Sequence, residues 1–343
     1  MRRPLALIVL LALMAAFAFG VNRFFAARKT TIASAAAPTE VHPEVALPGT
    51  LYLAQRGDIY RLSNGTFTDL HLPAGIGTWM QPAVVPGTPD IVAVARTAAY
   101  SDVYLIDGSN GKILRQLSHN KTATVTIQLW HWMFWPHVAA DGNTMVVSYD
   151  APKSGQSYEI DFAVWQGSVS QKPATQQWTQ PYSFTGGDVQ PLPLPGGRLL
   201  YAKYQITGGN VFSQLAMQTN ALGDIVYLTS AAADCAQPAV SPDGGTLAMI
   251  CASGTGLQST SLVVAPLQGT KLGTAHAVVA KCMCGAPAWS ADGSGLGYLA
   301  PADATGHFQL WWIAGASTPR PAAPKQVTTG LDFDATSPPA WAP

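Results

Sequence analysis

A short hairpin motif that recurs along the chain is the feature that most constrains its fold. Its clearest copy is Gln237 to Ile250, QPAVSPDGGTLAMI, in which Pro242, Asp243 and Gly244 separate two short apolar runs. Proline presets φ, aspartate hydrogen-bonds the backbone that follows it, and glycine accepts a positive φ. The motif therefore predicts two antiparallel strands joined by a tight turn.

The same motif returns at a nearly constant spacing. Aligned on the leading proline, its copies start at Pro82, Pro136, Pro191, Pro238, Pro287 and Pro339, which gives intervals of 54, 55, 47, 49 and 52 residues. The last copy is divided, because its first strand ends the chain and its second strand, GTLYLAQ, begins at Gly49. A repeat of about 50 residues with about four strands predicts the blades of a β-propeller, here an all-β fold with six blades.

The divided copy also predicts how the ring closes. An open ring leaves two unpaired strand edges, which are liabilities for aggregation. Pairing the C-terminal strand with the N-terminal strands of the same blade removes both edges. We therefore expect residues 340–343 to pair beside residues 51–54.

Three segments resemble a known family, the TolB-type six-bladed propellers built from WD40-like repeats with a PxWSPDG core. They are SPDG at Ser241 to Gly244, PAWSADG at Pro287 to Gly293, and PPAWAP at the C-terminus. The endings IVYLTS from Ile225 and KQVTTG from Lys325 are similar to outer strands of such blades. Ala140, Pro193 and Pro195 depart from the motif. The resemblance covers residues 49–343 and implies a protein-binding ring with its partner at a channel mouth.

The N-terminal residues are of another kind. An uncharged apolar run, residues 4–21, lies between Arg2 and Arg3 on one side and Arg23, Arg28 and Lys29 on the other. The apolar region of a signal peptide is about 7–15 residues and a spanning helix needs about 17–25, so the run lies at the border between the two. We favour an uncleaved anchor over residues 1–29, although Ala33 to Ala35 could be a cleavage site. Residues 30–48 are then a linker, and both alternatives place the propeller, residues 49–343, outside the cytoplasm, either tethered to the cell membrane or periplasmic or secreted.

Charge excludes one class of partner. Lys, Arg, Asp and Glu make up 11% of the residues and the formal net charge is zero, whereas an average soluble domain has about 25%. Nucleic-acid binding requires clustered Lys and Arg, and the sequence has no such cluster. We expect a monomer that binds no nucleic acid.

Candidate contact residues follow from the inner strand of each blade, whose side chains should alternate between the channel and the neighbouring blades. The positions just before and just after the repeat proline are expected to face the channel, and the next position, bulky at Trp289 and Trp341, to pack between blades. The channel-mouth candidates for partner binding are Gln81, Trp135, His137, Gln190 and Gln237.

An aromatic run, TIQLWHWMFWPH, precedes the third blade and adds Trp130 and Trp132 to the candidates. It could form an exposed platform for a peptide or glycan, since aromatic side chains dominate contact hot spots. The alternative, which we favour, is that it packs as the core of a long inter-blade loop. Metal binding by His131 and His137 is the interpretation that we favour least, because the sequence supplies no third ligand.

Four cysteines lie in the last two blades, and an oxidising compartment would allow them to form disulfides. Cys235 and Cys251 come close when the hairpin Gln237 to Ile250 folds, so we predict that they pair. Cys282 and Cys284 either pair or stay free.

No catalytic constellation is evident in the sequence. Asp188 is the only carboxylate near the expected inner mouth, the arginines are scattered, and GxSxG is absent. We predict no bound metal and no cofactor. The expected function is a non-catalytic extracytoplasmic propeller that docks another envelope or extracellular protein. The alternative is an extracytoplasmic propeller hydrolase or lyase, or a carbohydrate-binding propeller, that uses the same mouth.

Overall fold

The computed structural model describes residues 46–121, 130–150, 161–252, 260–302 and 306–343. The predicted anchor at residues 4–21 and most of the predicted linker lie outside these ranges. Over the described ranges, no helix has the length and apolar character needed to cross a bilayer.

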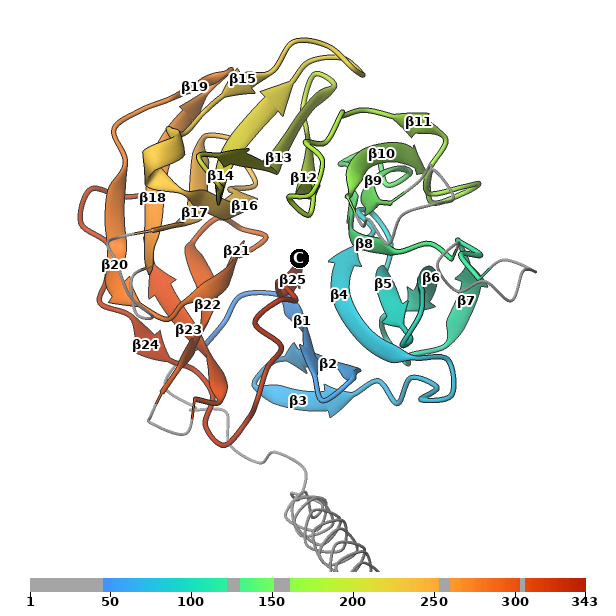
Figure 1. Cartoon of the computed structure of the whole chain (residues 1–343). Helices are drawn as coiled ribbons and strands as arrows, with labels where there is room; N and C mark the ends of the chain where they lie inside the picture. Colours follow the sequence, from blue (N-terminus) through green and yellow to red (C-terminus); the bar gives the residue numbers. More distant parts are fainter. Residues whose placement is uncertain (1–45, 122–129, 151–160, 253–259, 303–305) are drawn as a thin grey trace, which may run out of the picture. The chain divides into compact units, whose positions relative to one another are not determined.

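Six separate sheets surround a central axis, which confirms the predicted six-bladed, all-β propeller (Figure 1). From the axis outward, the first three sheets are β25 (Ala340–Ala342), β1 (Thr50–Gln55), β2 (Asp58–Ser63), β3 (Thr66–Asp69); β4 (Thr78–Val84), β5 (Asp90–Arg96), β6 (Ser101–Asp107), β7 (Ile113–Gln116); and β8 (Met133–Val138), β9 (Thr144–Tyr149), β10 (Ala163–Ser168), β11 (Gln176–Gln177).

The other three sheets follow the same order. They are β12 (Asp188–Leu194), β13 (Arg198–Thr207), β14 (Asn210–Gln218), β15 (Val226–Tyr227); β16 (Cys235–Val240), β17 (Thr246–Ala252), β18 (Thr260–Gln268), β19 (Lys271–Leu272); and β21 (Gly285–Trp289), β22 (Gly295–Pro301), β23 (Phe308–Ala314), β24 (Lys325–Gln326). An extra strand, β20 (His276–Cys282), pairs with β18. We number the blades 1 to 6 in this order.

Blade 1 is built from both ends of the folded region. β25 pairs antiparallel with β1, with Tyr52 opposite Ala340 and Thr50 opposite Ala342. The indole Nε1 of Trp341 donates a hydrogen bond to the carbonyl of Pro48, 2.6 Å away. The last residues of the chain therefore form the innermost strand of the first blade.

The aspartates of the repeated turns have a structural role. Oδ1 of Asp243 accepts from the backbone N–H of Gly245 at 3.0 Å, and Oδ1 of Asp292 accepts from that of Ser294 at 3.0 Å. The Ser241 hydroxyl also donates to Asp243. These bonds lower the pKa of both carboxyl groups and fix the turn between inner and second strand.

A side-chain hydroxyl that accepts a backbone hydrogen bond recurs just after the outer strands. In blade 2, the hydroxyl of Ser118 accepts from the backbone N–H of Val103 at 2.9 Å, beyond the last paired residue of β7. Thr179, Thr229 and Thr328 accept in the same way in blades 3, 4 and 6. The hydroxyl replaces a backbone carbonyl where the strand turns away, which explains the Thr residues in the endings IVYLTS and KQVTTG.

The core lies between neighbouring blades. Large side chains such as Trp79 and Tyr201 are fully buried. The predicted packing of Trp289 and Trp341 between blades is confirmed, because both are more than 90% buried and Trp289 Nε1 donates to the carbonyl of Ala239 in the preceding blade.

The cysteines form two disulfides. Cys235 on β16 is joined to Cys251, the residue directly opposite it on β17. Cys282 is joined to Cys284 in the segment that links β20 to β21. The first disulfide lies within blade 5, and the second lies where the chain passes from blade 5 to blade 6.

Candidate functional site

The inner strands enclose a cavity on the ring axis. Its volume is about 320 Å³, and residues from all six inner-strand segments line it. The wall is dominated by prolines, small apolar side chains and three tryptophans, and the repeat prolines recur around it: Pro82, Pro136, Pro191, Pro238, Pro287 and Pro339. Because prolines have a fixed φ and no side-chain freedom to lose, this wall is rigid.

The lining does not follow the predicted strict alternation. Consecutive residues Gln81, Pro82, Ala83 and Val84 all line the cavity. The reason is a bulge in the inner strand, where the pairing shifts from Met80 opposite Val94 to Ala83 opposite Val92. A bulge adds a residue to one strand and re-aims the side chains beside it.

The bulge recurs in the inner strands of blades 2 to 6. Each time, the residue before the repeat proline has a left-handed backbone, with φ of 52° at Gln81, 49° at Trp135, 56° at Gln190, 53° at Gln237 and 53° at Ala286. A non-glycine residue rarely adopts this conformation, and a residue before proline prefers extended backbone. Such strained positions persist only where the surrounding structure holds them, as they do in binding sites.

The glutamines at the bulges link neighbouring blades. Oε1 of Gln81 accepts from the backbone N–H of Trp135 at 2.7 Å, and Oε1 of Gln190 accepts from that of Gln237 at 2.8 Å. Oε1 of Gln237 accepts in turn from the N–H of Ala286 at 2.6 Å. Each glutamine thus holds the bulge of the next blade, and the hydroxyl of Ser337 does the same for Gln81 at 2.6 Å.

These bonds give the three glutamines a role that the sequence did not reveal. Gln81 is only 3% exposed, while Gln190 and Gln237 are half-buried at the cavity wall. Their amide oxygens are used between blades, and their contact with a partner stays a prediction.

Among the described residues that line the cavity, His137 is the only one with a titratable side chain. Its imidazole is solvent-accessible within the cavity, and the inner strands around it displace part of its hydration. This desolvation lowers the pKa of His137 from 6.5 to about 4, so the ring is neutral at pH 7.

The aromatic run before β8 is neither fully exposed nor fully buried. Trp132 stacks on Phe134 with 5.8 Å between ring centroids, and Phe134 contacts both Trp135 and Phe162. Trp130 packs edge-on against Tyr100 at 5.5 Å. All six of these side chains are half-buried, so the run combines inter-blade packing with partly accessible ring surface.

The two histidines of this segment have different surroundings. Nδ1 of His131 lies 3.1 Å from Oδ1 of Asp150, whereas His137 lines the axial cavity. In the described parts of the chain, no three His, Cys, Asp or Glu side chains are grouped as metal ligands.

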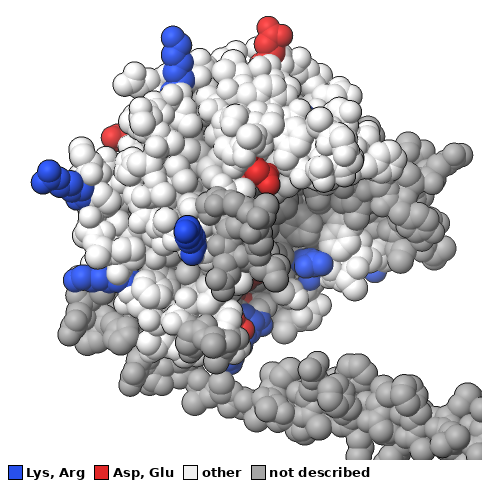
Figure 2. Space-filling model, turned by 60° about the vertical axis from the view of Figure 1, so that its left-hand side comes forward, with Lys and Arg blue, Asp and Glu red and all other residues white. Residues whose placement is uncertain are grey.

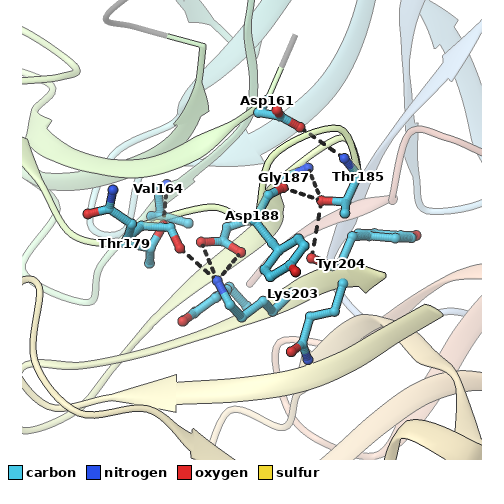
Figure 3. Close-up of polar contacts among 12 residues, drawn as sticks. Asp161, Val164, Thr179, Thr185, Gly187, Asp188, Lys203 and Tyr204 are labelled. Carbon is cyan, nitrogen blue, oxygen red and sulfur yellow. Dashed lines mark hydrogen bonds and ion pairs between the residues drawn. The ribbon is translucent and has the colours of Figure 1, made fainter. Parts of the chain in front are cut away.

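Asp188, the carboxylate expected near the inner mouth, is buried in a polar cluster between blades 3 and 4 (Figure 3). Nζ of Lys203, directly opposite on β13, lies 3.0 Å from its Oδ1 and also donates to the carbonyl of Gln180 at 2.8 Å. Burial raises the pKa of Asp188 to about 6, although Lys203 acts in the opposite direction. The carboxylate is therefore used in an internal ion pair.

The neighbouring loop is held by a second carboxylate. Asp161 accepts hydrogen bonds from the backbone N–H groups of Phe184, Thr185 and Gly186 at 2.8, 3.2 and 3.0 Å. Three consecutive donors on one carboxylate fix the path of the chain into β12. Phe184, with φ of 65°, is 77% exposed on this loop.

Comparison with known proteins identifies the fold. No protein-family model and no curated protein sequence matches the chain. Among solved structures, TolB from Acinetobacter baumannii matches with a TM-score of 0.60 at 15% identity, over 86% of this chain and 67% of that one. A putative TolB from Agrobacterium tumefaciens matches with a TM-score of 0.58 at 12% identity, over 84% and 91%.

A third similar structure comes from a nidogen/laminin complex, with a TM-score of 0.55 at 10% identity, over 85% of this chain and 98% of that one. At these identities the likeness defines the fold alone. The chain is a TolB-like six-bladed β-propeller, as the sequence motifs predicted.

Proposed function

We propose that the protein is a non-catalytic binding propeller that docks another protein at the mouth of its axial cavity. The observation that carries the proposal is the construction of the cavity wall. Prolines from every inner strand make it rigid, and bulges held by inter-blade hydrogen bonds fix its side chains. A preformed apolar pocket binds with little loss of conformational entropy.

The wall also indicates the chemistry of the occupant. The half-buried side chains of Val84, Trp135, Leu192 and Val240 offer apolar surface. The imidazole of His137 is neutral at pH 7. A cavity of about 320 Å³ is at the lower end for ligand sites. It fits a few apolar residues of a protein segment, with the surrounding ring surface, including Trp132, in contact with the rest of the partner.

We also propose that the propeller lies outside the cytoplasm, tethered through residues 4–21. The two disulfides support an oxidising compartment, and the apolar run with flanking positive charges supports the anchor. Protease digestion of intact and permeabilised cells, together with N-terminal sequencing, tests both points. Digestion only after permeabilisation of the cytoplasmic membrane, or loss of residues 4–21, would contradict the tethered arrangement.

The docking proposal is tested by filling the cavity. His137→Trp places a bulky side chain in the cavity, where the wild-type side chain is exposed and contributes little to the core. The matched control is Leu114→Trp, because Leu114 is 44% exposed on the outer strand β7. Partner capture from the native envelope should be lost with the first variant and kept with the second, at equal melting temperatures. Equal capture by both variants would refute docking in the cavity.

A glycan array and a panel of hydrolase substrates separate the alternative functions. Retention of a sugar, or turnover that His137→Trp abolishes, would replace protein docking by a carbohydrate-binding or enzymatic role.

A further inference from the structure

A second hollow lies away from the axis, between blades 1 and 2. Its volume is about 630 Å³. It is lined by the turn after β1, the segment before β4 and the end of β5: Arg56, Gly57, Ala74, Gly75, Ile76, Gly77, Thr78, Arg96, Thr97 and Ala98. We call it the blade 1–2 cleft. Its two charged lining residues are both arginines.

The floor of the blade 1–2 cleft is rigid. The backbone N–H of Trp79 donates to the carbonyl of Gly57 at 2.9 Å and so joins the two blades. Gly77 packs against the end of β5, where a Cβ atom would lie 2.8 Å from the carbonyl oxygen of Arg96. Only glycine allows this approach, so the cleft exists before any ligand binds.

Arg56 occupies a position that suits glycine better. Its φ is 53°, in the left-handed region, where a long side chain carries a backbone cost. A residue held in such a conformation is a candidate for function. Its side chain is exposed, and it forms no ion pair with any residue in the described ranges.

Arg96 reaches the cleft from the neighbouring blade. Its Cζ lies 5.9 Å from the ring centroid of Trp132. Stacking on an aromatic face orients a guanidinium and leaves its edge donors available. Asp58, the carboxylate nearest to Arg56 in the sequence, accepts instead from the backbone N–H groups of Ile59 and Leu72. No carboxylate among the described residues forms an ion pair with Arg96.

Two guanidinium groups that line one hollow stand out because charged residues are few in this protein. Charged side chains are sparse over the part of the surface that Figure 2 shows, where most of the described atoms are uncharged. Arginine forms paired hydrogen bonds with planar oxyanions. The cleft therefore has the charge, the donors and the room for an anionic group.

We propose that the blade 1–2 cleft binds a carboxylate of the docked partner, an acidic side chain or a C-terminus. The inference rests on the proposed function, because it takes the occupant to be a protein. Continuity supports it: Thr78 lines the cleft and Gln81, three residues further along β4, lines the axial cavity. That distance is about 10 Å at the rise of a strand. A segment seated in the cavity can thus place a carboxylate between the two arginines.

The test uses small anions and does not need the partner. The full chain, labelled with ¹⁵N-glycine, is titrated with N-acetylglutamate at constant ionic strength, and the amide signals of Gly57, Gly75 and Gly77 are followed. We expect these signals to shift, and we expect N-acetylglutaminamide, which has no carboxylate, to have no effect. Arg56→Gln and Arg96→Gln should each weaken binding about tenfold, because hydrogen bonds to charged groups are among the strong ones. The matched control is Arg320→Gln, at another exposed arginine.

Several results would overturn the proposal. They are equal weakening by Arg320→Gln, equal binding of N-acetylglutaminamide, or binding of inorganic phosphate alone, which would reassign the cleft to phosphate groups. Arg56→Gly separates binding from folding, since it should weaken binding while keeping or raising the melting temperature. Loss of binding only in variants that melt earlier would also contradict the proposal. Because no partner is present, these outcomes are independent of whether the axial cavity docks a protein.

Discussion

The buried pair of Lys203 and Asp188 gives the most quantitative prediction. Asp188 is fully buried, Lys203 is 5% exposed, and Nζ lies 3.0 and 3.3 Å from the two carboxylate oxygens. Lys203→Met keeps most of the apolar stem and removes the cation. The carboxylate is then left in the core without its partner.

The expected cost at pH 7 is about 3–5 kcal/mol of the free energy of unfolding, which is typical when one member of a buried ion pair is removed. The reason is desolvation, which already raises the pKa of Asp188 from 3.8 to about 6 with Lys203 present. Without the ammonium group the pKa rises further. The variant then folds with a neutral carboxyl group.

The sign of the pH dependence follows. A carboxyl group whose pKa is higher in the folded than in the unfolded state contributes stability below its unfolded pKa. This contribution is lost as pH rises through the folded pKa. In wild type the loss falls between pH 3.8 and about 6. In Lys203→Met it extends above pH 6, at up to about 1.4 kcal/mol for each pH unit. The variant should therefore approach wild type as the pH is lowered toward 4.

Urea unfolding of wild type, Lys203→Met and the double variant Asp188→Leu/Lys203→Met, from pH 4 to 8, provides the assay. The double variant replaces both charges by apolar groups of similar size and should lie within about 1 kcal/mol of wild type. A cost below about 1 kcal/mol for Lys203→Met at every pH would refute the reasoning. It would show that Asp188 is solvated in the folded protein.

Three further predictions concern the ring and its cavity. Removing residues 336–343 deletes β25 and should abolish cooperative melting followed by circular dichroism; a truncated chain that melts like the full chain would contradict closure through blade 1. Gln237→Ala leaves the N–H of Ala286 without its acceptor and should cost about 1–3 kcal/mol in urea unfolding; an unchanged midpoint would mean that the bond does not hold the bulge. The imidazole of His137 should titrate near pH 4 by NMR. Its contribution to stability should be lost as pH falls from 6.5 toward 4, because the unfolded chain takes up the proton first. Titration near pH 6.5 would show that the cavity does not desolvate the ring.

The blades could be predicted from the sequence because each hairpin encodes its own turn. Pro242, Asp243 and Gly244 specify backbone angles and a local hydrogen bond, and neither depends on the rest of the chain. Repetition of this signal at a period of about 50 residues then fixes the architecture. The endings that contain Thr229 and Thr328 were recognised in the sequence, but their cause, a hydroxyl that accepts from the third strand, needed the structure.

The geometry of the site could not be predicted in the same way. The left-handed backbone at Gln81 and Trp135 is imposed by neighbouring blades, against the preference of a residue that precedes proline. The alternation rule therefore failed beside the bulges. The pairing of Asp188 with Lys203 depends on strand register. Arg56 and Arg96 are far apart in the sequence and share a cleft only because two blades pack together.

The proposed function requires a protein partner to occupy the axial cavity. The most direct measurement places a photo-crosslinking amino acid at position 137, or at position 114 on the outer strand as a control, in the protein expressed in its native envelope. The account predicts a covalent adduct with one partner from position 137, with the cross-linked peptide mapped to a single apolar segment of that partner, and none from position 114. Adducts from position 114 alone, or the same adducts from both positions, would contradict it.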